Sequence, residues 1–263
     1  MTLQAMIDDA AKGEPLTIVD GWAQGRATYG GLVAALQLAA MKARNEGKVP
    51  PLRSLTTNFV APVSPGEVTI ESALPRQGTN VTQCEARIVQ DGQVVSLAFA
   101  SFGAGRRSDV RVHPHTRMPE MPDPFDLRPL GHKAGRDPEF LKHMELRLVD
   151  GDKPFTGSDR TSFTGWMRLR EPGPTFGEEH LVALADAWPV PVLQRLLEPA
   201  AASSVSWTLE IVGDMRHIAP TTQWAYSARA DTAKDGYAHA EARIWRPHGT
   251  LTAISRQTVA VFG

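Results

Sequence analysis

Three polar residues in the second half of the chain, Asp186, Thr208 and Gln257, have side chains that together could do chemistry. A carboxylate such as that of Asp186 can accept a proton from water when a dry environment brings its pKa toward neutral pH. The hydroxyl of Thr208 and the amide of Gln257 can orient such a water, although neither serves easily as a base. These three side chains could therefore bind and activate a water molecule.

Other familiar catalytic patterns are missing from the sequence. Ser158 lies in TGSDR without the flanking glycine of a nucleophile elbow. Cys84 is the sole cysteine, which excludes an internal disulfide and a cysteine-cluster metal site. A dyad of Cys84 with a histidine stays open, but alternation with Ala86 and Ile88 favours a buried strand face for the thiol. A bare thiol is typical of a reducing compartment, so we expect a cytoplasmic protein.

Composition narrows the function classes further. The 263 residues carry 28 Lys and Arg against 29 Asp and Glu, so no excess of positive charge supports binding to nucleic acid. No stretch approaches the roughly 18 uncharged apolar residues of a membrane span. The first residues, MTLQAMIDDAAKGEP, carry acids where a signal peptide is basic and then apolar. We therefore expect a soluble protein without nucleic-acid or membrane partners.

An internal repeat in the sequence predicts the elements that position the three polar residues. Helical patterns are predicted over 30–41 (GGLVAALQLAAM) and 178–187 (EEHLVALADA), which share nearly the same core string. The tetrapeptide EARI recurs at 85–88 and 241–244, at the same place in each half. Asp91-Gly92 predicts a tight hairpin because both positions favour positive φ. A duplicated unit of one helix and an antiparallel sheet is the interpretation that fits.

The predicted strands show the same order in both halves. In the first half they span roughly 54–61, 66–74, 79–90 and 93–103. In the second half they span roughly 203–213, 222–231, 236–246 and 250–262, preceded by opening strands at 138–149 and 162–170. We expect an N-terminal unit over 1–108, a proline-rich surface linker over 109–130 and a C-terminal unit over 131–263.

Aligning the halves shows where they differ. The aligned pairs are Gln37 with Asp186, Thr56 with Thr208, and Ala100 with Gln257. The second unit thus holds an acid on its helix and a hydroxyl and an amide on its strands. Symmetric scaffolds often keep chemistry in one of two equivalent places, which makes the second unit the candidate. An ordinary helix cap for Asp186, and strand positions for Thr208 and Gln257, remain the structural alternatives.

The chain resembles the acyl-CoA thioesterase II type, in which two hot-dog folds are fused. The resemblance spans nearly the whole length, through TYGGLVAALQLAA, SLTTNFVAPVSPGEV, GWMRLRE, LVALADAWPVPVL, SVSWTLEIV and AISRQTVAVF. It implies an α+β double hot-dog fold whose halves pack face to face. It also implies that Asp186, Thr208 and Gln257 hold the hydrolytic water. Glu210 and Thr258 depart from the family pattern, which has an aspartate in the first position and an acid in the second.

The expected activity is hydrolysis of a small-molecule acyl-CoA thioester, with no metal or redox cofactor. The helix start at Gly30-Gly31 is the candidate for binding the carbonyl oxygen, because unpaired N–H groups and the positive dipole end coincide there. Close helix–sheet packing is the alternative reason for these glycines. Exposed sheet edges predict a homo-oligomer.

Two rival functions remain open. One is a non-catalytic acyl-CoA binding module, in which Asp186 is incidental. The other is an enoyl-thioester hydratase or dehydratase, which needs an acid/base pair, usually Asp with His, at one helix start. His180 lies six residues before Asp186, so the two side chains fall on different helical faces, which counts against this rival.

Overall fold

The computed structural model describes residues 1–46 and 48–262. Its α-helices are α1 (Leu3–Ala10), α2 (Gly30–Arg44) and α3 (Glu178–Ala185), and four short 3₁₀ helices are η1 (Asp20–Trp22), η2 (Pro124–Asp126), η3 (Glu139–His143) and η4 (Pro191–Arg195). No helix in these ranges is long and apolar enough to cross a membrane. The strands of the first half are β1 (Leu16–Ile18), β2 (Ala23–Gln24), β3 (Ala27–Thr28), β4 (Leu52–Phe59), β5 (Gly66–Gln77), β6 (Val81–Gln90) and β7 (Gln93–Gly103). Those of the second half are β8 (Met144–Asp150), β9 (Ser162–Leu169), β10 (Ala202–Ile211), β11 (Trp224–Lys234), β12 (Tyr237–Trp245) and β13 (Leu251–Val261).

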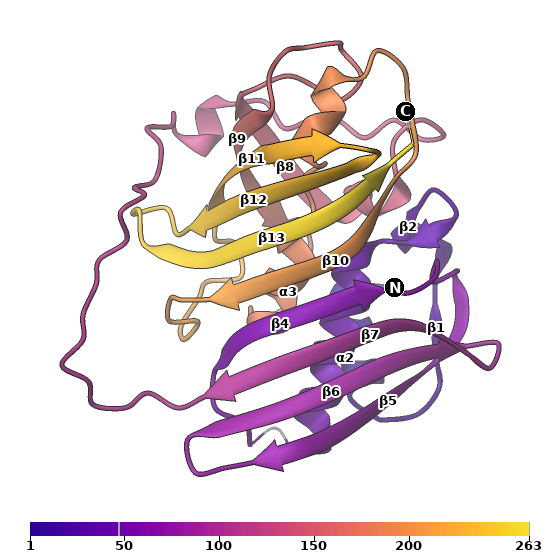
Figure 1. Cartoon of the computed structure of the whole chain (residues 1–263), viewed down its shortest axis with the longest axis vertical. Helices are drawn as coiled ribbons and strands as arrows, with labels where there is room; N and C mark the ends of the chain where they lie inside the picture. Colours follow the sequence, from indigo (N-terminus) through magenta and orange to yellow (C-terminus); the bar gives the residue numbers. More distant parts are fainter. Residues whose placement is uncertain (47, 263) are drawn as a thin grey trace.

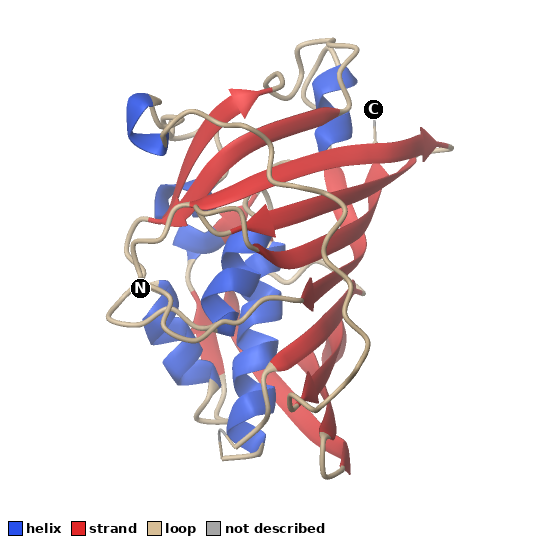
Figure 2. Ribbon diagram, turned by 90° about the vertical axis from the view of Figure 1, so that its left-hand side faces the viewer, coloured by secondary structure: helices blue, strands red, loops and turns tan. Residues whose placement is uncertain are grey.

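Eleven strands form one antiparallel sheet in the order β1-β5-β6-β7-β4-β10-β13-β12-β11-β9-β8 (Figure 1). The helices α1, α2 and α3 gather on one side of this sheet, which gives the α+β architecture predicted from the repeat (Figure 2). The expectation that the halves pack face to face is wrong. They join edge to edge, because β4 of the first half pairs with β10 of the second and makes the two sheets continuous.

Local sequence explains most of the strand pattern. Asp91 and Gly92 take φ values of 51° and 74°, so the predicted hairpin between β6 and β7 is confirmed. Each strand predicted between 54 and 103 and between 203 and 262 has a counterpart in the sheet. The strand predicted over 138–149 is only partly correct, because η3 occupies its first half and β8 begins at Met144. Helix α1 was not predicted.

Helices α2 and α3 run antiparallel against each other and connect the two halves. At one end, the Tyr29 hydroxyl donates a hydrogen bond to the Ala183 carbonyl oxygen, with 2.6 Å between the oxygens. At the other end, Lys42 Nζ contacts carboxylate oxygens of Glu178 and Glu179 at 3.3 and 2.8 Å. Nearly all of α2 is buried, so its hydrophobic side chains form the centre of the core. This packing brings the start of α2 to the end of α3.

Part of the proline-rich segment between β7 and β8 is bound to the second unit. Met118, Met121 and Leu127 pack against the cluster that contains Trp166 and Trp245 on the outward face of the sheet.

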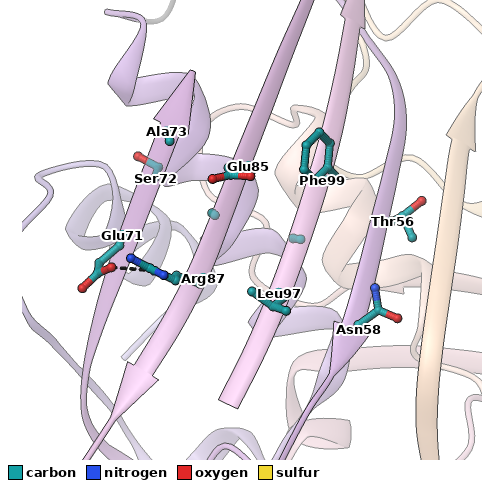
Figure 3. Close-up of a pocket in the computed structure, with 11 residues that line it drawn as sticks. Thr56, Asn58, Glu71, Ser72, Ala73, Glu85, Arg87, Leu97 and Phe99 are labelled. Carbon is teal, nitrogen blue, oxygen red and sulfur yellow. Dashed lines mark hydrogen bonds and ion pairs between the residues drawn. The ribbon is translucent and has the colours of Figure 1, made fainter. Parts of the chain in front are cut away.

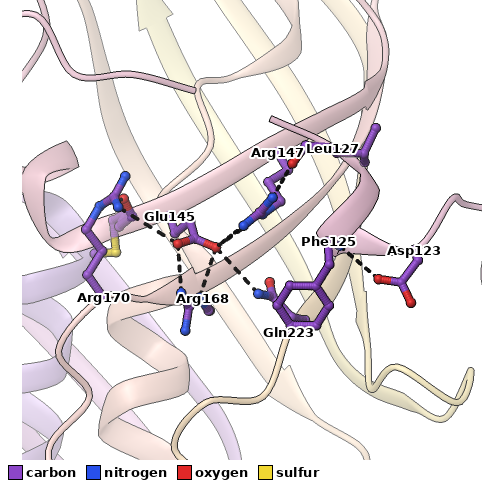
Figure 4. A network of polar contacts seen from close by, with 9 residues as sticks. Asp123, Phe125, Leu127, Glu145, Arg147, Arg168, Arg170 and Gln223 are labelled. Atoms are coloured by element: carbon purple, nitrogen blue, oxygen red, sulfur yellow. Dashed lines mark hydrogen bonds and ion pairs between the residues drawn. The ribbon is translucent and has the colours of Figure 1, made fainter. Parts of the chain in front are cut away.

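A buried carboxylate organises the strands beneath this segment (Figure 4). Glu145 receives hydrogen bonds from Arg147 and Arg168, and these guanidinium groups hold its pKa well below the usual range, at about 2. Arg147 also donates to the carbonyl oxygen of Leu127 and lies over the ring of Phe125. The network therefore ties the connecting segment to β8.

The contact between Glu178 and the first half predicts a measurable stability change. Its carboxylate accepts a hydrogen bond from Leu52 N–H at 2.8 Å, and the bond is buried. Glu178→Ala leaves that N–H without an acceptor, so we expect the free energy of unfolding to fall by about 1–3 kcal/mol. Urea denaturation measures this change. Glu178→Gln keeps an oxygen acceptor and should lose less, and wild-type stability in the alanine variant would contradict the assignment.

Candidate active site

Asp186 lies at the point where α3 ends. It is the C-cap residue, with φ −95° and ψ 5°, and the following Ala187-Trp188-Pro189 cannot continue the helix because proline lacks an N–H. One carboxylate oxygen, Oδ1, accepts a hydrogen bond from Gln257 Nε2 at 2.5 Å. The other, Oδ2, faces the first turn of α2, only 3.0 Å from where a side-chain carbon on Gly30 would lie. The carboxylate is thus held between two elements.

The glycine pair makes the approach of α2 to Asp186 possible. A Cβ on Gly31 would lie 2.6 Å from the Tyr29 ring and 2.7 Å from the Ala183 carbonyl oxygen, which is closer than real Cβ atoms come. Tyr29 provides no side-chain cap, so the first N–H groups of α2 are free to serve other acceptors. The N–H of Gly31 lies near the Asp186 carboxylate and acts to lower its pKa. The positive end of the helix dipole also lies here.

Burial dominates the ionisation of Asp186. Desolvation raises its pKa from 3.8 to about 7, although the hydrogen bond from Gln257 and the nearby Gly31 N–H act in the opposite direction. A carboxyl group with a pKa near neutrality can take up and release protons at neutral pH. Strongly perturbed acids of this kind cluster at functional sites.

Gln257 reaches Asp186 from the inward face of β13. It pairs with Trp207 of β10, whose indole is buried in the core, so the two side chains lie on the helix side of the sheet. In the first half, the residue equivalent to Asp186 is Gln37, and both ends of its amide are occupied by hydrogen bonds within the fold. Gln37 donates to the Ala86 carbonyl oxygen and accepts from Ser96 Oγ at 3.1 Å. The difference between the halves seen in the sequence is therefore a difference in role: the Gln37 amide is fully hydrogen-bonded within the fold, whereas Asp186 can ionise.

Thr208 is not brought to Asp186, and the prediction that groups the two side chains needs correction. It neighbours Trp207 and Leu209, whose side chains point into the core, so alternation along the strand turns Thr208 outward. Its Oγ1 lies 3.0 Å from Thr56 Oγ1 across the pairing of β4 with β10. Thr208 also lines a hollow on the outward face of the second unit. Figure 3 shows the matching hollow of the first unit, where Thr56, Glu85 and Phe99 are seen.

Ser204 provides an inward-facing hydroxyl position on β10 that the sequence did not reveal. The pairing of β10 with β13 shifts register between Ser204 and Ser206, which marks a bulge at Val205. Ser204 pairs with Val259, whose side chain is buried, so its own side chain lies on the face that carries Gln257. Strict alternation from Thr208 would have placed Ser204 outward. No feature of the sequence signals the bulge.

Family models match both halves of the chain. The acyl-CoA thioesterase N-terminal domain matches residues 18–103, and the acyl-CoA thioesterase C-terminal domain matches residues 115–261. Comparison with curated proteins found no match.

Solved structures share the fold. A hot-dog protein of unknown function from Alicyclobacillus acidocaldarius is 26% identical, with a TM-score of 0.87 over 98% of both chains. A putative thioesterase II from Thermobifida fusca is 20% identical, with a TM-score of 0.79 over 98% of this chain and 97% of that one. An acyl-CoA thioesterase II from Mycobacterium marinum is 20% identical, with a TM-score of 0.71 over 97% and 98%. The double hot-dog fold predicted from the sequence is confirmed.

The raised pKa of Asp186 predicts a pH-dependent penalty on stability. Between pH 3.8 and about 7 the folded chain holds a proton that the unfolded chain has released, so stability falls as pH rises through this window. Asp186→Asn cannot ionise and removes the penalty. We expect it to stabilise the protein by up to about 4 kcal/mol at pH 8 and by little at pH 4. Chemical denaturation at the two pH values measures this, and an equal effect at both would contradict the raised pKa.

Proposed function

The chain belongs to the acyl-CoA thioesterase family, and on that premise we propose that it hydrolyses acyl-CoA thioesters with Asp186 as the general base. One observation carries the proposal. The Asp186 carboxylate lies between the start of α2 and Gln257, in surroundings that bring its pKa to about 7. A base with such a pKa can deprotonate water at neutral pH and return the proton within one turnover.

In the proposed reaction, Asp186 takes a proton from a water held beside it. The water oxygen forms a bond to the thioester carbonyl carbon, and the carbonyl electrons move onto oxygen. When the carbonyl forms again, the carbon–sulfur bond breaks, and the thiolate takes up the proton to leave as the thiol of coenzyme A. The other product is the free acid. Every proton that the reaction needs comes from the attacking water.

The first turn of α2 is the proposed site for the developing oxyanion. Since the Gly31 N–H lies near Asp186, we assign the carbonyl oxygen to the N–H of Gly30, which has no intrahelical acceptor. One such donor typically lowers the barrier by about 2.7–4 kcal/mol. Gln257 orients Asp186 through its amide, and Ser204 takes the water-orienting role that the sequence had assigned to Thr208.

The geometry around α3 weighs against the hydratase or dehydratase. His180 Nδ1 accepts a hydrogen bond from the Gly177 N–H at 3.1 Å, which places this histidine at the opposite end of α3 from Asp186. Burial also lowers the pKa of His180, so the ring is neutral at neutral pH. The pair of acid and base that such an enzyme needs is therefore not assembled from these two residues.

Three further expectations belong to this proposal. The first is the division of the chain into an N-terminal unit over 1–108 and a C-terminal unit over 131–263, joined by the linker over 109–130. The second is a location in the cytoplasm, because a free, buried thiol such as that of Cys84 suits a reducing compartment. We also propose a homo-oligomer. Its support is the set of exposed apolar side chains on the outward face of the sheet, namely Leu97, Phe99 and Val205.

The proposal predicts that Asp186→Asn abolishes turnover without unfolding the protein. Thiol release from a panel of short, long, branched and aromatic acyl-CoAs should fall by at least about 100-fold, because the proposed proton acceptor is gone. Circular dichroism checks that the variant is folded. Unchanged turnover would contradict the site, and saturable binding without turnover in the wild type would favour the acyl-CoA binding module.

A matched pair of hydroxyl variants tests which residue orients the water. Ser204→Ala should lower kcat by about tenfold or more, the effect of losing one hydrogen bond to the reacting water. Thr208→Val keeps the shape of the side chain on the outward face, and its kcat should stay within about twofold of the wild type. The reverse order of effects would restore the role first predicted for Thr208.

A further inference from the structure

Tyr29, the residue before α2, is held from three sides. Its N–H donates to the Trp22 carbonyl oxygen at 2.9 Å. Its ring stacks on Phe140, with 3.9 Å between the ring centroids and 3° between the ring planes. Its hydroxyl donates to the Ala183 carbonyl oxygen at 2.6 Å. Because the whole side chain is buried, these contacts give Tyr29 one fixed position, from which it reaches across to α3.

The ring on which Tyr29 stacks is itself anchored. Phe140 lies in η3, and at the end of that helix His143 stacks on Trp22, with 3.9 Å between the ring centroids and 7° between the planes. The Nε2–H of His143 also donates to the Gly21 carbonyl oxygen at 3.1 Å. Two stacked pairs of rings therefore hold the segment that leads into α2 against η3 of the second half.

The carbonyl oxygen that Tyr29 binds lies in the last turn of α3. Carbonyl groups in that turn lack the usual intrahelical donor. The N–H of Ala187 donates to the Leu184 carbonyl oxygen, and the Tyr29 hydroxyl serves the carbonyl oxygen of Ala183. Asp186 follows Ala183 by three residues, which places the two on the same side of the helix. A movement of this turn would therefore move the Asp186 carboxylate as well.

The same turn makes the closest approach to α2. A Cβ on Gly31 would lie 2.7 Å from the Ala183 carbonyl oxygen, and one on Gly30 would lie 3.0 Å from Asp186 Oδ2. The bond from the Tyr29 hydroxyl and the Asp186 carboxylate thus belong to one contact between the two helices. Burial, together with the charge of Asp186, raises the pKa of Tyr29 well above its usual value, so the hydroxyl remains a donor at neutral pH.

Building on the proposed thioesterase function, we propose that Tyr29 is a positioning residue, whose hydroxyl, through its bond to Ala183, sets the distance between Asp186 and the first turn of α2. Phe140 supports this role by fixing the ring of Tyr29. The distance decides how well water is kept from the carboxylate and how near the carboxylate lies to the Gly30 N–H that is assigned to the oxyanion. Loss of the hydroxyl should therefore change both the ionisation of Asp186 and kcat.

The test measures the pKa of Asp186 in Tyr29→Phe, a change that removes only the hydroxyl. NMR follows the carboxyl carbon in protein made with isotope-labelled aspartate, and the signal is identified by its absence from Asp186→Asn. We expect the pKa to fall from about 7 by about one pH unit or more, because water then hydrates the carboxylate. Phe140→Leu, which removes the stacked ring, should lower the pKa by less, and it provides the test if Tyr29→Phe does not fold.

Ser96→Ala is the matched control, since it also removes one buried hydroxyl, which lies 3.1 Å from Gln37 Oε1 in the first half. It should lower stability, as Tyr29→Phe does, and leave the pKa of Asp186 unchanged. An unchanged pKa in Tyr29→Phe, or an equal fall of the pKa in Ser96→Ala, would overturn the positioning role.

Thiol release from acyl-CoA is measured separately on the same proteins. Tyr29→Phe should lower kcat by about tenfold, the effect of one hydrogen bond, and leave KM within about twofold of the wild type. A lowered pKa in Tyr29→Phe, with no thiol release by the wild type, would refute the hydrolase while the positioning of Asp186 by Tyr29 stands. Thiol release by a wild type whose Asp186 pKa does not respond to Tyr29→Phe would refute the positioning role and leave the hydrolase intact.

Discussion

The close approach of the first turn of α2 to the last turn of α3 is the constraint on which the candidate site depends. Gly31 has no side chain, so the Tyr29 ring and the Ala183 carbonyl oxygen can occupy the space where a Cβ would lie. Asp186 then lies against the first turn of α2 and is removed from water. The same contact that joins the two halves therefore creates the unusual ionisation of the acid. An alanine at Gly31 would force the helices apart.

The edge-to-edge joining of the two sheets explains why one chain can hold the whole site. Pairing of β4 with β10 places Thr56 opposite Thr208, so equivalent positions of the two halves meet at the junction. Helix α2 of the first half then faces the end of α3 of the second. The first half contributes backbone donors, and the second contributes the acid and the amide. Divergence between the halves has left Gln37 as a structural amide where the second half keeps Asp186.

Much of this arrangement could be predicted from local sequence. Helical periodicity, the Asp91-Gly92 turn and the aligned core strings located α2, α3 and most strands, since these features depend on neighbouring residues. Asp186 and Gln257 were found because the halves could be aligned, and the structure brings their side chains into contact. Sequence resemblance also identified the fold, which the family models and solved structures confirm.

What could not be predicted depends on tertiary structure. The bulge at Val205 reverses the alternation of β10, and one inserted residue decides that Ser204 faces inward and Thr208 outward along the strand. Helix α1 and η3 are short, and their packing against other elements is not visible in local patterns. The contacts of the Trp188 ring with Phe163 and Tyr226 are equally non-local, because β9, β11 and the segment after α3 each supply one ring.

We propose that a buried Asp186 with a raised pKa acts as the base in thioester hydrolysis. The pH dependence of kcat/KM for the best acyl-CoA substrate tests this claim most directly, because that ratio reports the ionisation of the free enzyme. We predict that kcat/KM rises about tenfold per pH unit below neutrality and reaches a plateau above an apparent pKa of about 7. A profile that is flat from pH 5 to 9, or one governed by a pKa near 4, would contradict it.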